Sequence, residues 1–258
     1  MPTDWMLFAE ICLLACLAGA FGSMVGLGGG LLLVPALITA FHVPDGHARF
    51  AGLVAVCVTS LSGSIVYIRQ GVTDMRAAGL LQLPTTVGAI CGALVGERIN
   101  ENILRSLFAA LLVYTAWKML RTRQQKEAEE PTPSRMAGAI TACVFGGVVS
   151  ALLGVGGGVV FAPVLSMIMN KPQRVASATS TYLIALTAAG SGLIYAKNIP
   201  ESAIASVVIP GAIGIFFGAQ IGAYLSGIVS GLWLKRILAV GVVGTAASLI
   251  VKVVNSIG

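Results

Sequence analysis

Two glycine-rich stretches could present main-chain amides to a ligand. The first is Gly26–Gly30, followed by an apolar run that ends at Pro35, and the second is Gly154–Gly158, followed by a similar run that ends at Pro163. A helix that begins after such a break points its free N–H groups and a partial positive charge back at the glycines. Two such helix starts could hold an anion without a charged side chain. The other interpretation is that the glycines only let helices pack closely.

The glycines of the two breaks are therefore the first candidate binding residues. They are Gly28, Gly29, Gly30, Gly156, Gly157 and Gly158. Neither stretch has the pattern of a nucleotide-binding loop, because no Gly-Lys-Ser/Thr follows and G-x-G-x-x-G is not completed. We favour the binding interpretation, because irregular backbone at membrane depth is tolerated only where protein or a cavity supports it.

Hydroxyl side chains and one arginine extend this candidate site. Within Ala176–Thr181, the hydroxyls of Thr179 and Ser180 could donate to the oxygens of an oxyanion. Equally, they could cap the helix or bond to a neighbouring helix. The first half has Arg49 at the corresponding place, in a polar turn around Pro44. Arg49 could attract anions at the outer mouth of a site, or anchor a loop at the membrane interface.

Composition indicates that these residues lie in a membrane. Of the 258 residues, 57% are hydrophobic and 10% charged, whereas soluble domains carry roughly a quarter charged residues. Charge-free runs such as Phe50–Ile68, Ala77–Gly96 and Val175–Ala196 reach the roughly 20 residues that a helix needs to cross a bilayer. We expect an all-α, multi-pass membrane protein surrounded by lipid. The net charge of +6 then belongs to loops that set orientation and does not indicate nucleic-acid binding.

The residue pattern predicts neither a cofactor nor a metal site. The five cysteines lie in apolar runs without the spacing of metal ligands. The charge-free helices also lack converging acids, histidines or a nucleophile with its base, so an enzyme is disfavoured.

The chain also contains an internal repeat with a constant offset of 128 residues. The pairs at this offset are Gly26 and Gly154, Pro35 and Pro163, Thr59 and Thr187, and Tyr67 and Tyr195. We predict two membrane repeats, residues 1–120 and 136–258, joined by a charged cytoplasmic linker over residues 121–135. Each repeat would have five segments.

The segment after each break decides how the repeats are related. Leu31–Phe41 has about 11 residues, which is too short to span the bilayer as a helix. If all five segments of a unit cross, the second unit enters from the opposite face, and the fold is two inverted repeats of five transmembrane or half-membrane helices. If the short segments dip in and return, each unit has four spans and the repeats are parallel.

Basic residues favour one orientation of the inverted arrangement. With both termini outside, eleven of the 16 Lys and Arg residues fall on the inner side. The five on the outer side are Arg49, Arg98, Arg105, Lys197 and Lys252. Because cytoplasmic loops carry the excess of Lys and Arg, we expect periplasmic termini.

Two further patterns lie inside the expected helices. Thr59 and Thr187 could back-bond to the preceding helical turn or line a pore. Glycines spaced by four run from Gly88 to Gly96 and from Gly214 to Gly222. Such stripes of small residues let helices approach closely.

Together these residues resemble the sulfite exporter TauE/SafE family of membrane transporters. The resemblance rests on a G-x-G-G-G-hydrophobic-P stretch in each half, on Ala176–Ser180 as an Ala-x-x-Thr-Ser helix start, and on Arg69–Gly71 as a basic-x-Gly loop. The first half departs from the family pattern at Ala51-Gly52, which lacks Thr-Ser.

This resemblance implies a secondary transporter that exports sulfite or a small organosulfonate across the bacterial inner (cytoplasmic) membrane. From the residues we expect alternating access around one anion site. A channel for the same anions is the nearest alternative, and a non-transporting membrane scaffold is another. The sequence leaves open whether the chain forms a homo-oligomer.

Overall fold

The structure is a computed structural model that describes residues 4–25, 28–96, 98–121 and 133–225. The described chain is helical and contains no strand in these ranges.

Five helices make up the first half of the chain. They are α1 (Asp4–Val25), α2 (Gly30–Thr39), α3 (Asp45–Arg69), α4 (Met75–Gly96) and α5 (Glu101–Arg121).

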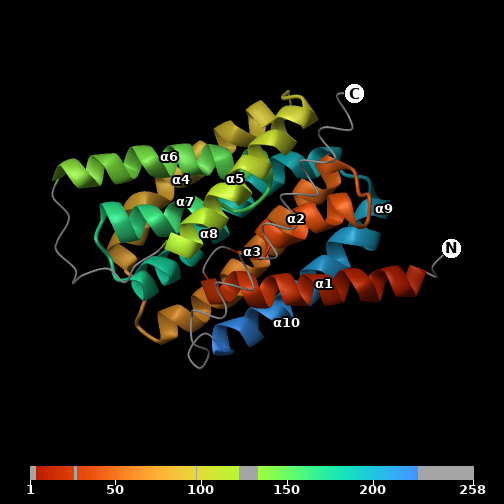
Figure 1. Cartoon of the computed structure of the whole chain (residues 1–258), viewed down its shortest axis with the longest axis horizontal. Helices are drawn as coiled ribbons and strands as arrows, with labels where there is room; N and C mark the ends of the chain where they lie inside the picture. The colour runs from red at the N-terminus through yellow and green to blue at the C-terminus, as the bar shows by residue number, and fades with distance from the viewer. Residues whose placement is uncertain (1–3, 26–27, 97, 122–132, 226–258) are drawn as a thin grey trace.

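As far as residue 225, the second half repeats the order of the first four of these helices with more irregular turns. Its elements are α6 (Pro133–Leu153), α7 (Gly158–Pro163), the π-helical turn η1 (Val164–Ile168), α8 (Gln173–Tyr195), the 3-10 turn η2 (Ala196–Asn198), α9 (Glu201–Ala203), the π-helical turn η3 (Ile204–Val208) and α10 (Ile209–Leu225). Residues 122–132 of the expected linker lie outside the described residues, and its last three residues belong to α6. The last segment expected for the repeat 136–258 also lies outside the described residues. Figure 1 shows α1 and α6 running near the long axis of the molecule, with α3, α5 and α10 oblique to it.

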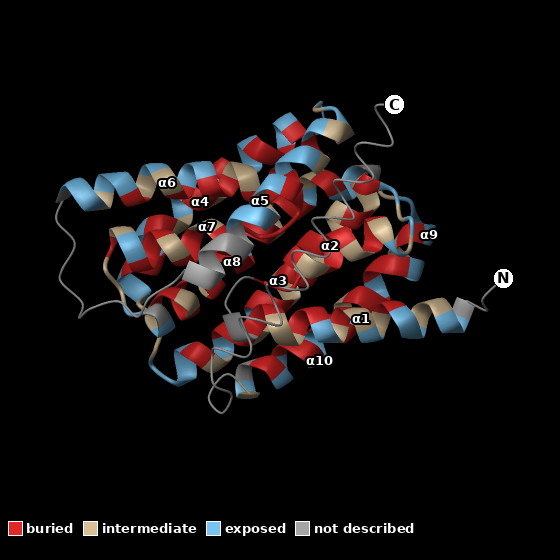
Figure 2. Cartoon of the chain, viewed as in Figure 1, coloured by how far each residue is buried: buried red, intermediate tan, exposed pale blue. Residues whose placement is uncertain are grey.

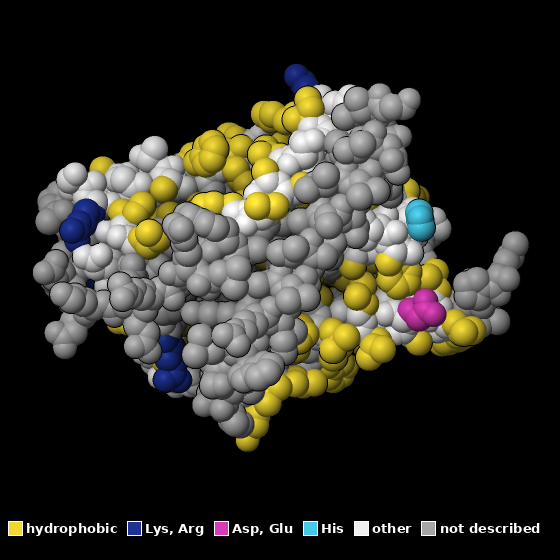
Figure 3. All heavy atoms as spheres, viewed as in Figure 1, with side chains coloured by type: hydrophobic (Ala, Val, Ile, Leu, Met, Phe, Trp, Pro, Cys, Tyr) yellow, Lys and Arg dark blue, Asp and Glu magenta, His cyan; other side chains and the backbone are white. Residues whose placement is uncertain are grey.

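Within the described ranges, five helical stretches are long and apolar enough to cross a membrane. They are Trp5–Ser23, Asp45–Arg69, Met75–Gly96, Ser134–Leu153 and Glu201–Gly222. Large side chains on their outer faces are exposed, among them Leu83 and Phe145 at 75% and 68%. Figure 3 shows hydrophobic side chains over most of the described part of one face, with the few charged ones toward its margins. A bilayer is the solvent that suits such a surface.

The segments that follow the glycine breaks are half-length helices. Helix α2 has 10 residues, which corresponds to about 15 Å of helix, or half the roughly 30 Å thickness of the hydrocarbon core. The corresponding stretch of the second half, Gly158–Ile168, is also a short apolar helix. Figure 2 shows that many residues of α2 and of the middle of α3 are buried.

Helix α3 begins earlier than the sequence predicted. Asp45 and Arg49 lie in its first turns and not in a polar turn, so Arg49 is a helix residue. Pro44 occupies the N-cap position with extended backbone (ψ 140°), which suits a helix start. An acid in the first turn is stabilised by the helix dipole, and Asp45 also pairs with Arg105 of α5 at 2.6 Å.

The glycine stripes bring helices from the two halves together. A Cβ added to Gly88 of α4 would strike the carbonyl oxygen of Val144 in α6. In the same way, a Cβ on Gly214 of α10 would strike the carbonyl oxygen of Cys12 in α1. The predicted close-packing role of both stripes is therefore confirmed.

Helices α3 and α8 pack against each other in opposite directions. The thiol of Cys57 donates to the carbonyl oxygen of Ala185 over 3.6 Å. Toward the end of α3, Gly63 lies next to Thr181, and toward its start Leu53 lies next to Gly192. Because the numbers fall along α8 as they rise along α3, the two helices are antiparallel.

Local geometry recurs at the offset of 128 residues. Tyr67 donates to the carbonyl oxygen of Ser23 at 3.2 Å, and Tyr195 donates to that of Ala151 at 3.3 Å. His42 and Asn170 are the non-glycine residues with positive φ in the described chain, at 53° and 51°. Thr59 and Thr187 each donate to the carbonyl oxygen four residues back, at 2.8 and 2.7 Å. The back-bonding interpretation of these two threonines is thus confirmed.

Candidate functional site

Both helix breaks are built on glycine backbone that other residues rarely adopt. Gly28 has φ 77° and Gly156 has φ 80°, and only glycine reaches this region without steric cost. Gly29 and Gly157 are the N-caps of α2 and α7, and neither helix start has a side-chain cap. The first N–H groups of a helix have no partner within the helix, so both breaks keep the donors that the sequence predicted.

The two breaks meet at one side chain in the interior. A Cβ on Gly28 would lie 3.2 Å from Val56 of α3, and one on Gly30 would lie 2.5 Å from it. Gly156 of the other break also abuts Val56, and it abuts Ile184 of α8 as well. Val56 and Ile184 are fully buried and are separated by the repeat offset of 128 residues. The structure therefore brings three of the six predicted glycines together around Val56.

The remaining predicted glycines pack against other neighbours. Gly29 lies against Ile215 of α10, where a Cβ would come within 2.5 Å of the side chain. Gly157 lies 2.6 Å from the Phe161 ring by the same measure. Gly158 begins α7 and is buried. In this conformation the glycines are thus enclosed by apolar side chains.

A hydroxyl without a partner lies beside the second break. The Cβ of Ser150 in α6 is 3.1 Å from the position that a Cβ on Gly157 would occupy. Ser150 is 2% exposed. Its Oγ has no hydrogen-bond partner in the described chain. A buried hydroxyl of this kind calls for an explanation, because most buried polar atoms are hydrogen-bonded.

Arg49 also lies at the second break. Its backbone contacts Gly154, where a Cβ would be 2.8 Å from the Arg49 Cα. Its Nε donates to the Asp45 carbonyl oxygen at 3.2 Å, and its guanidinium carbon is 5.8 Å from the centre of the Tyr195 ring. The Nη1 atom is buried and finds no partner among the described residues. The sequence predicted Arg49 but gave no sign that it meets the break of the opposite half.

Thr179 and Ser180 have separate surroundings on α8. The Thr179 hydroxyl accepts the N–H of Asp74 at 3.0 Å, so it fixes the loop between α3 and α4. Ser180 is fully buried, and its Oγ lacks a partner in the described ranges. Thr179 thus bonds to loop backbone and not to a neighbouring helix, and because its hydroxyl accepts in this bond, its proton is free for another partner.

Asp74 joins three segments at the end of the molecule where α4 begins. Its carboxylate accepts the N–H groups of Arg76 and Ala77, which caps α4, and it pairs with Lys171 at 2.6 Å. Partial burial raises the pKa of Asp74, but the hydrogen bonds from Lys171 and Ala77 outweigh it and leave the pKa below 3.8. No cluster of three or more potential metal-ligating side chains occurs where the structure is described.

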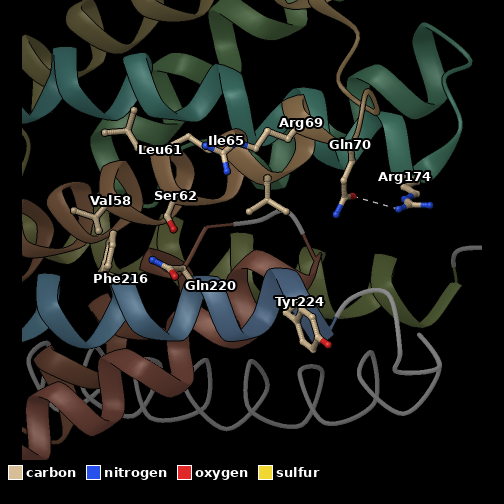
Figure 4. A pocket seen from close by; sticks show the side chains of 11 residues that line it. Val58, Leu61, Ser62, Ile65, Arg69, Gln70, Arg174, Phe216, Gln220 and Tyr224 are labelled. Carbon is tan, nitrogen blue, oxygen red and sulfur yellow. Dashed lines mark hydrogen bonds between the residues drawn. The ribbon is translucent and has the colours of Figure 1, made fainter.

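A cavity of about 890 Å³ lies between α3 and α10, close to the start of α8. Figure 4 shows Gln70 and Arg174 facing each other at its mouth, and Ser62 and Gln220 on facing walls. None of the predicted site residues lines it. The sequence identified Arg69 as part of a family loop but did not predict the cavity. The signal was Gln220, a polar amide inside the otherwise apolar helix α10.

Comparison with known proteins places this architecture in a family. The profile of the family described as Sulfite exporter TauE/SafE matches residues 11–249, which include both glycine breaks. The chain belongs to the sulfite exporter TauE/SafE family. The resemblance inferred from the two G-x-G-G-G stretches is thereby confirmed.

Curated relatives of this TauE/SafE chain carry transporter names. Over 246 residues it is 27% identical to the probable membrane transporter protein YunE of Bacillus subtilis, which covers 86% of this chain and 89% of the relative. A probable membrane transporter protein of Methanocaldococcus jannaschii is 29% identical over 268 residues, with 93% and 94% covered. No solved structure matches the chain. The family and the names of these relatives identify a multi-pass membrane transporter.

Proposed function

We propose that this TauE/SafE protein is a secondary transporter that exports sulfite or a small organosulfonate across the bacterial inner membrane by alternating access. The substrate anion would bind at the converging helix breaks. Gly28, Gly29 and Gly30 would contribute main-chain N–H groups from one half, and Gly156, Gly157 and Gly158 would contribute them from the other.

One observation carries the proposal. The second break is flanked by two buried donors without partners, Arg49 Nη1 and Ser150 Oγ, and each residue contacts a glycine of the break. A guanidinium N–H and a hydroxyl both suit an oxyanion. Ser180 Oγ is a third buried group of this kind. Together with uncapped helix starts, these donors would bind a negative charge with the Arg49 guanidinium as the one formal charge among them.

The arrangement of the halves supports the inverted repeat in this proposal. Helices α3 and α8 occupy equivalent positions in the two halves and run antiparallel. Helix α1 packs on α10, and its counterpart α6 packs on α4, the counterpart of α10. Two units related in this way would rock against each other around a site at their interface. Val56 contacts glycines of both breaks, so in the proposed cycle it would have to move to admit the anion.

The proposal is tested with purified protein in liposomes loaded with sulfite, taurine or isethionate. We expect saturable, proteoliposome-specific efflux of at least one of these. Gly29→Val and Gly157→Val should abolish efflux, because each side chain would fill the break. Gly138→Val is the matched control, because Gly138 lies in α6 with no atom within 4 Å of an added Cβ. Membrane insertion is checked by yield and by gel filtration.

Two milder variants test the donors. Ser150→Ala and Arg49→Gln should each raise the half-saturating anion concentration about tenfold or more, as expected for a lost hydrogen bond to a charged ligand. Ser206→Ala is the control for the serine, because Ser206 is exposed and only back-bonds to Ser202. Unchanged efflux in both donor variants would remove the second break from the substrate site. Efflux that grows linearly with anion concentration would indicate a channel.

A further inference from the structure

The cavity between α3 and α10 has charged residues at one end and mostly apolar walls, which Ser62 and Gln220 interrupt. Its mouth is formed by Arg69 and Gln70 at the end of α3 and by Arg174 at the start of α8. Leu61 and Phe216 line its walls and remain 54% and 43% exposed. In Figure 4, Phe216 points toward Val58 at the end of the cavity far from the arginines. An occupant with an anionic head and a hydrocarbon tail would match this gradient.

The depth of the cavity matches one leaflet of a bilayer. Its lining on α3 runs from Val58 to Arg69, a rise of about 16 Å along a helix. The hydrocarbon core of a bilayer is about 30 Å thick. An acyl chain that enters from the charged end of α3 would therefore lie along the cavity to near the bilayer centre.

The charge at the mouth is not neutralised by the protein. Arg174 donates from Nη2 to Gln70 Oε1 at 3.3 Å, and neither Arg69 nor Arg174 has a carboxylate partner within the described chain. Asp74, the acid in the adjoining loop, is paired with Lys171. Arg69 and Arg174 therefore leave two positive charges among the lining of the cavity, and arginine suits a phosphate diester because its fork of N–H donors matches phosphate oxygens.

We propose that this cavity binds an anionic phospholipid, with its phosphate at Arg69, Gln70 and Arg174 and one acyl chain along Leu61 and Phe216. Basic pockets between helices on the cytoplasmic side of a membrane bind lipid headgroups in this way. The exposed apolar walls favour a lipid over a soluble anion, because they would gain nothing from a small hydrophilic ligand. The proposal requires that the chain sits in a bilayer with this end on the cytoplasmic side, as the basic residues predict, and it is independent of the helix breaks.

The test is native mass spectrometry of delipidated, full-length protein titrated with phosphatidylglycerol. We expect stoichiometric binding that is at least tenfold tighter than binding of phosphatidylcholine of the same chain length. Arg69→Gln with Arg174→Gln should weaken phosphatidylglycerol binding about 30-fold, given the contribution of each arginine near an anionic headgroup.

The control variant also removes two positive charges, but from arginines that do not line the cavity. Arg76→Gln with Arg135→Gln affects two exposed arginines that do not line the cavity, and it should leave phosphatidylglycerol binding unchanged. Gel filtration and thermal melting check that each variant is folded. Equal binding in the two double variants, or equal binding of phosphatidylcholine, would overturn the proposal. Competition by glycerol 3-phosphate at the same concentration as the lipid would show an anion site without a tail, and would overturn it too.

Discussion

Val56 blocks the access of a ligand to the glycine breaks in this conformation. It touches Gly28 and Gly30 of the first break and Gly156 of the second, and it is fully buried. The breaks can accept a ligand only if this valine moves away or the backbone around it shifts. Gly156 is therefore constrained twice, by its φ of 80° and by its contact with Val56.

Gly156→Ala should destabilise the protein by about 3 kcal/mol, from left-handed strain and overpacking together. In a Val56→Ala background the same change should cost only about 1–2 kcal/mol, because the strain and the contact with Ile184 remain but the closest clash, with the Val56 side chain, is removed. Reversible unfolding in SDS measures both differences. The contact would be disproved by equal costs in the two backgrounds.

Arg49 allows a second prediction at this scale. Its Nε donates to the Asp45 carbonyl oxygen, its guanidinium lies over the Tyr195 ring, and its Nη1 has no hydrogen-bond partner among the described residues. Lysine carries the charge but cannot make these contacts from one planar group. Arg49→Lys should therefore lose about tenfold in anion affinity, measured by efflux from liposomes, whereas Lys197→Arg should have no effect. Wild-type affinity in Arg49→Lys would mean that only the charge matters.

Most individual roles could not be predicted from the residues alone. The sequence pointed to the six glycines because broken backbone is improbable in a membrane without a reason. Val56, Ile184 and Ser150 carried no signal, because an aliphatic or small residue in an apolar helix is what any core requires. Arg49 was predicted, but its contact with Gly154 depends on packing between distant segments.

At the scale of elements, the close pairs α4–α6 and α1–α10 depend on glycine. A Cβ on Gly88 would meet the backbone of α6, which cannot give way as a side chain can. The same helix contains Gly79, where an added Cβ meets nothing within 4 Å. The two positions form a matched pair.

Gly88→Ala should destabilise the protein by about 1–3 kcal/mol through overpacking. Gly79→Ala should cause no loss, because alanine is the better helix former. Unfolding in SDS compares the two variants directly. Equal stability of both would show that α4 and α6 are not in close contact.

The junction at Asp74 predicts a pH dependence. Its pKa lies below 3.8 in the folded protein, so its contribution is present above the unfolded pKa and is lost as pH falls through the folded pKa. Asp74→Asn should therefore lower the melting temperature slightly between pH 5 and 8, by the equivalent of about 1 kcal/mol or less for a partly exposed pair. At pH values below the folded pKa, where the carboxyl is protonated in the folded and the unfolded state, the variant and the wild type should converge. A difference that persists there would exclude the carboxylate as the cause.

Helix positions were largely predictable, because charge-free runs and glycine breaks mark their ends. The start of α3 was not, because His42, Asp45 and Arg49 look like a solvated turn. Their polar character is accommodated within the fold instead: Asp45 is buried against Arg105 of α5. That pair joins residues 60 positions apart, which no local pattern reveals.

At the scale of the whole molecule, the proposed topology assigns the loops to opposite sides. In a variant without its five native cysteines, Ser134→Cys should react with a membrane-impermeant maleimide only after the cells are opened. Glu201→Cys should react in intact cells. Both residues are exposed in the structure, so accessibility does not distinguish them. Labelling of both from the same side would contradict the inverted arrangement.

The duplicated plan was visible in the sequence as a constant offset, but the cavity between α3 and α10 was not. Its residues come from three helices and share no motif, and its shape follows from how far α10 lies from α3. The distance between two packed helices depends on all the side chains between them, so no single motif predicts it.

The contact between Cys57 and Ala185 has a consequence of its own. These positions are 128 residues apart, so each faces its own counterpart, and a two-fold axis relating the halves would pass between them. The two copies of a position beside such an axis lie next to each other. A larger side chain introduced at either position would contact both halves. A cross-link between the two positions would restrict rotation of one half relative to the other.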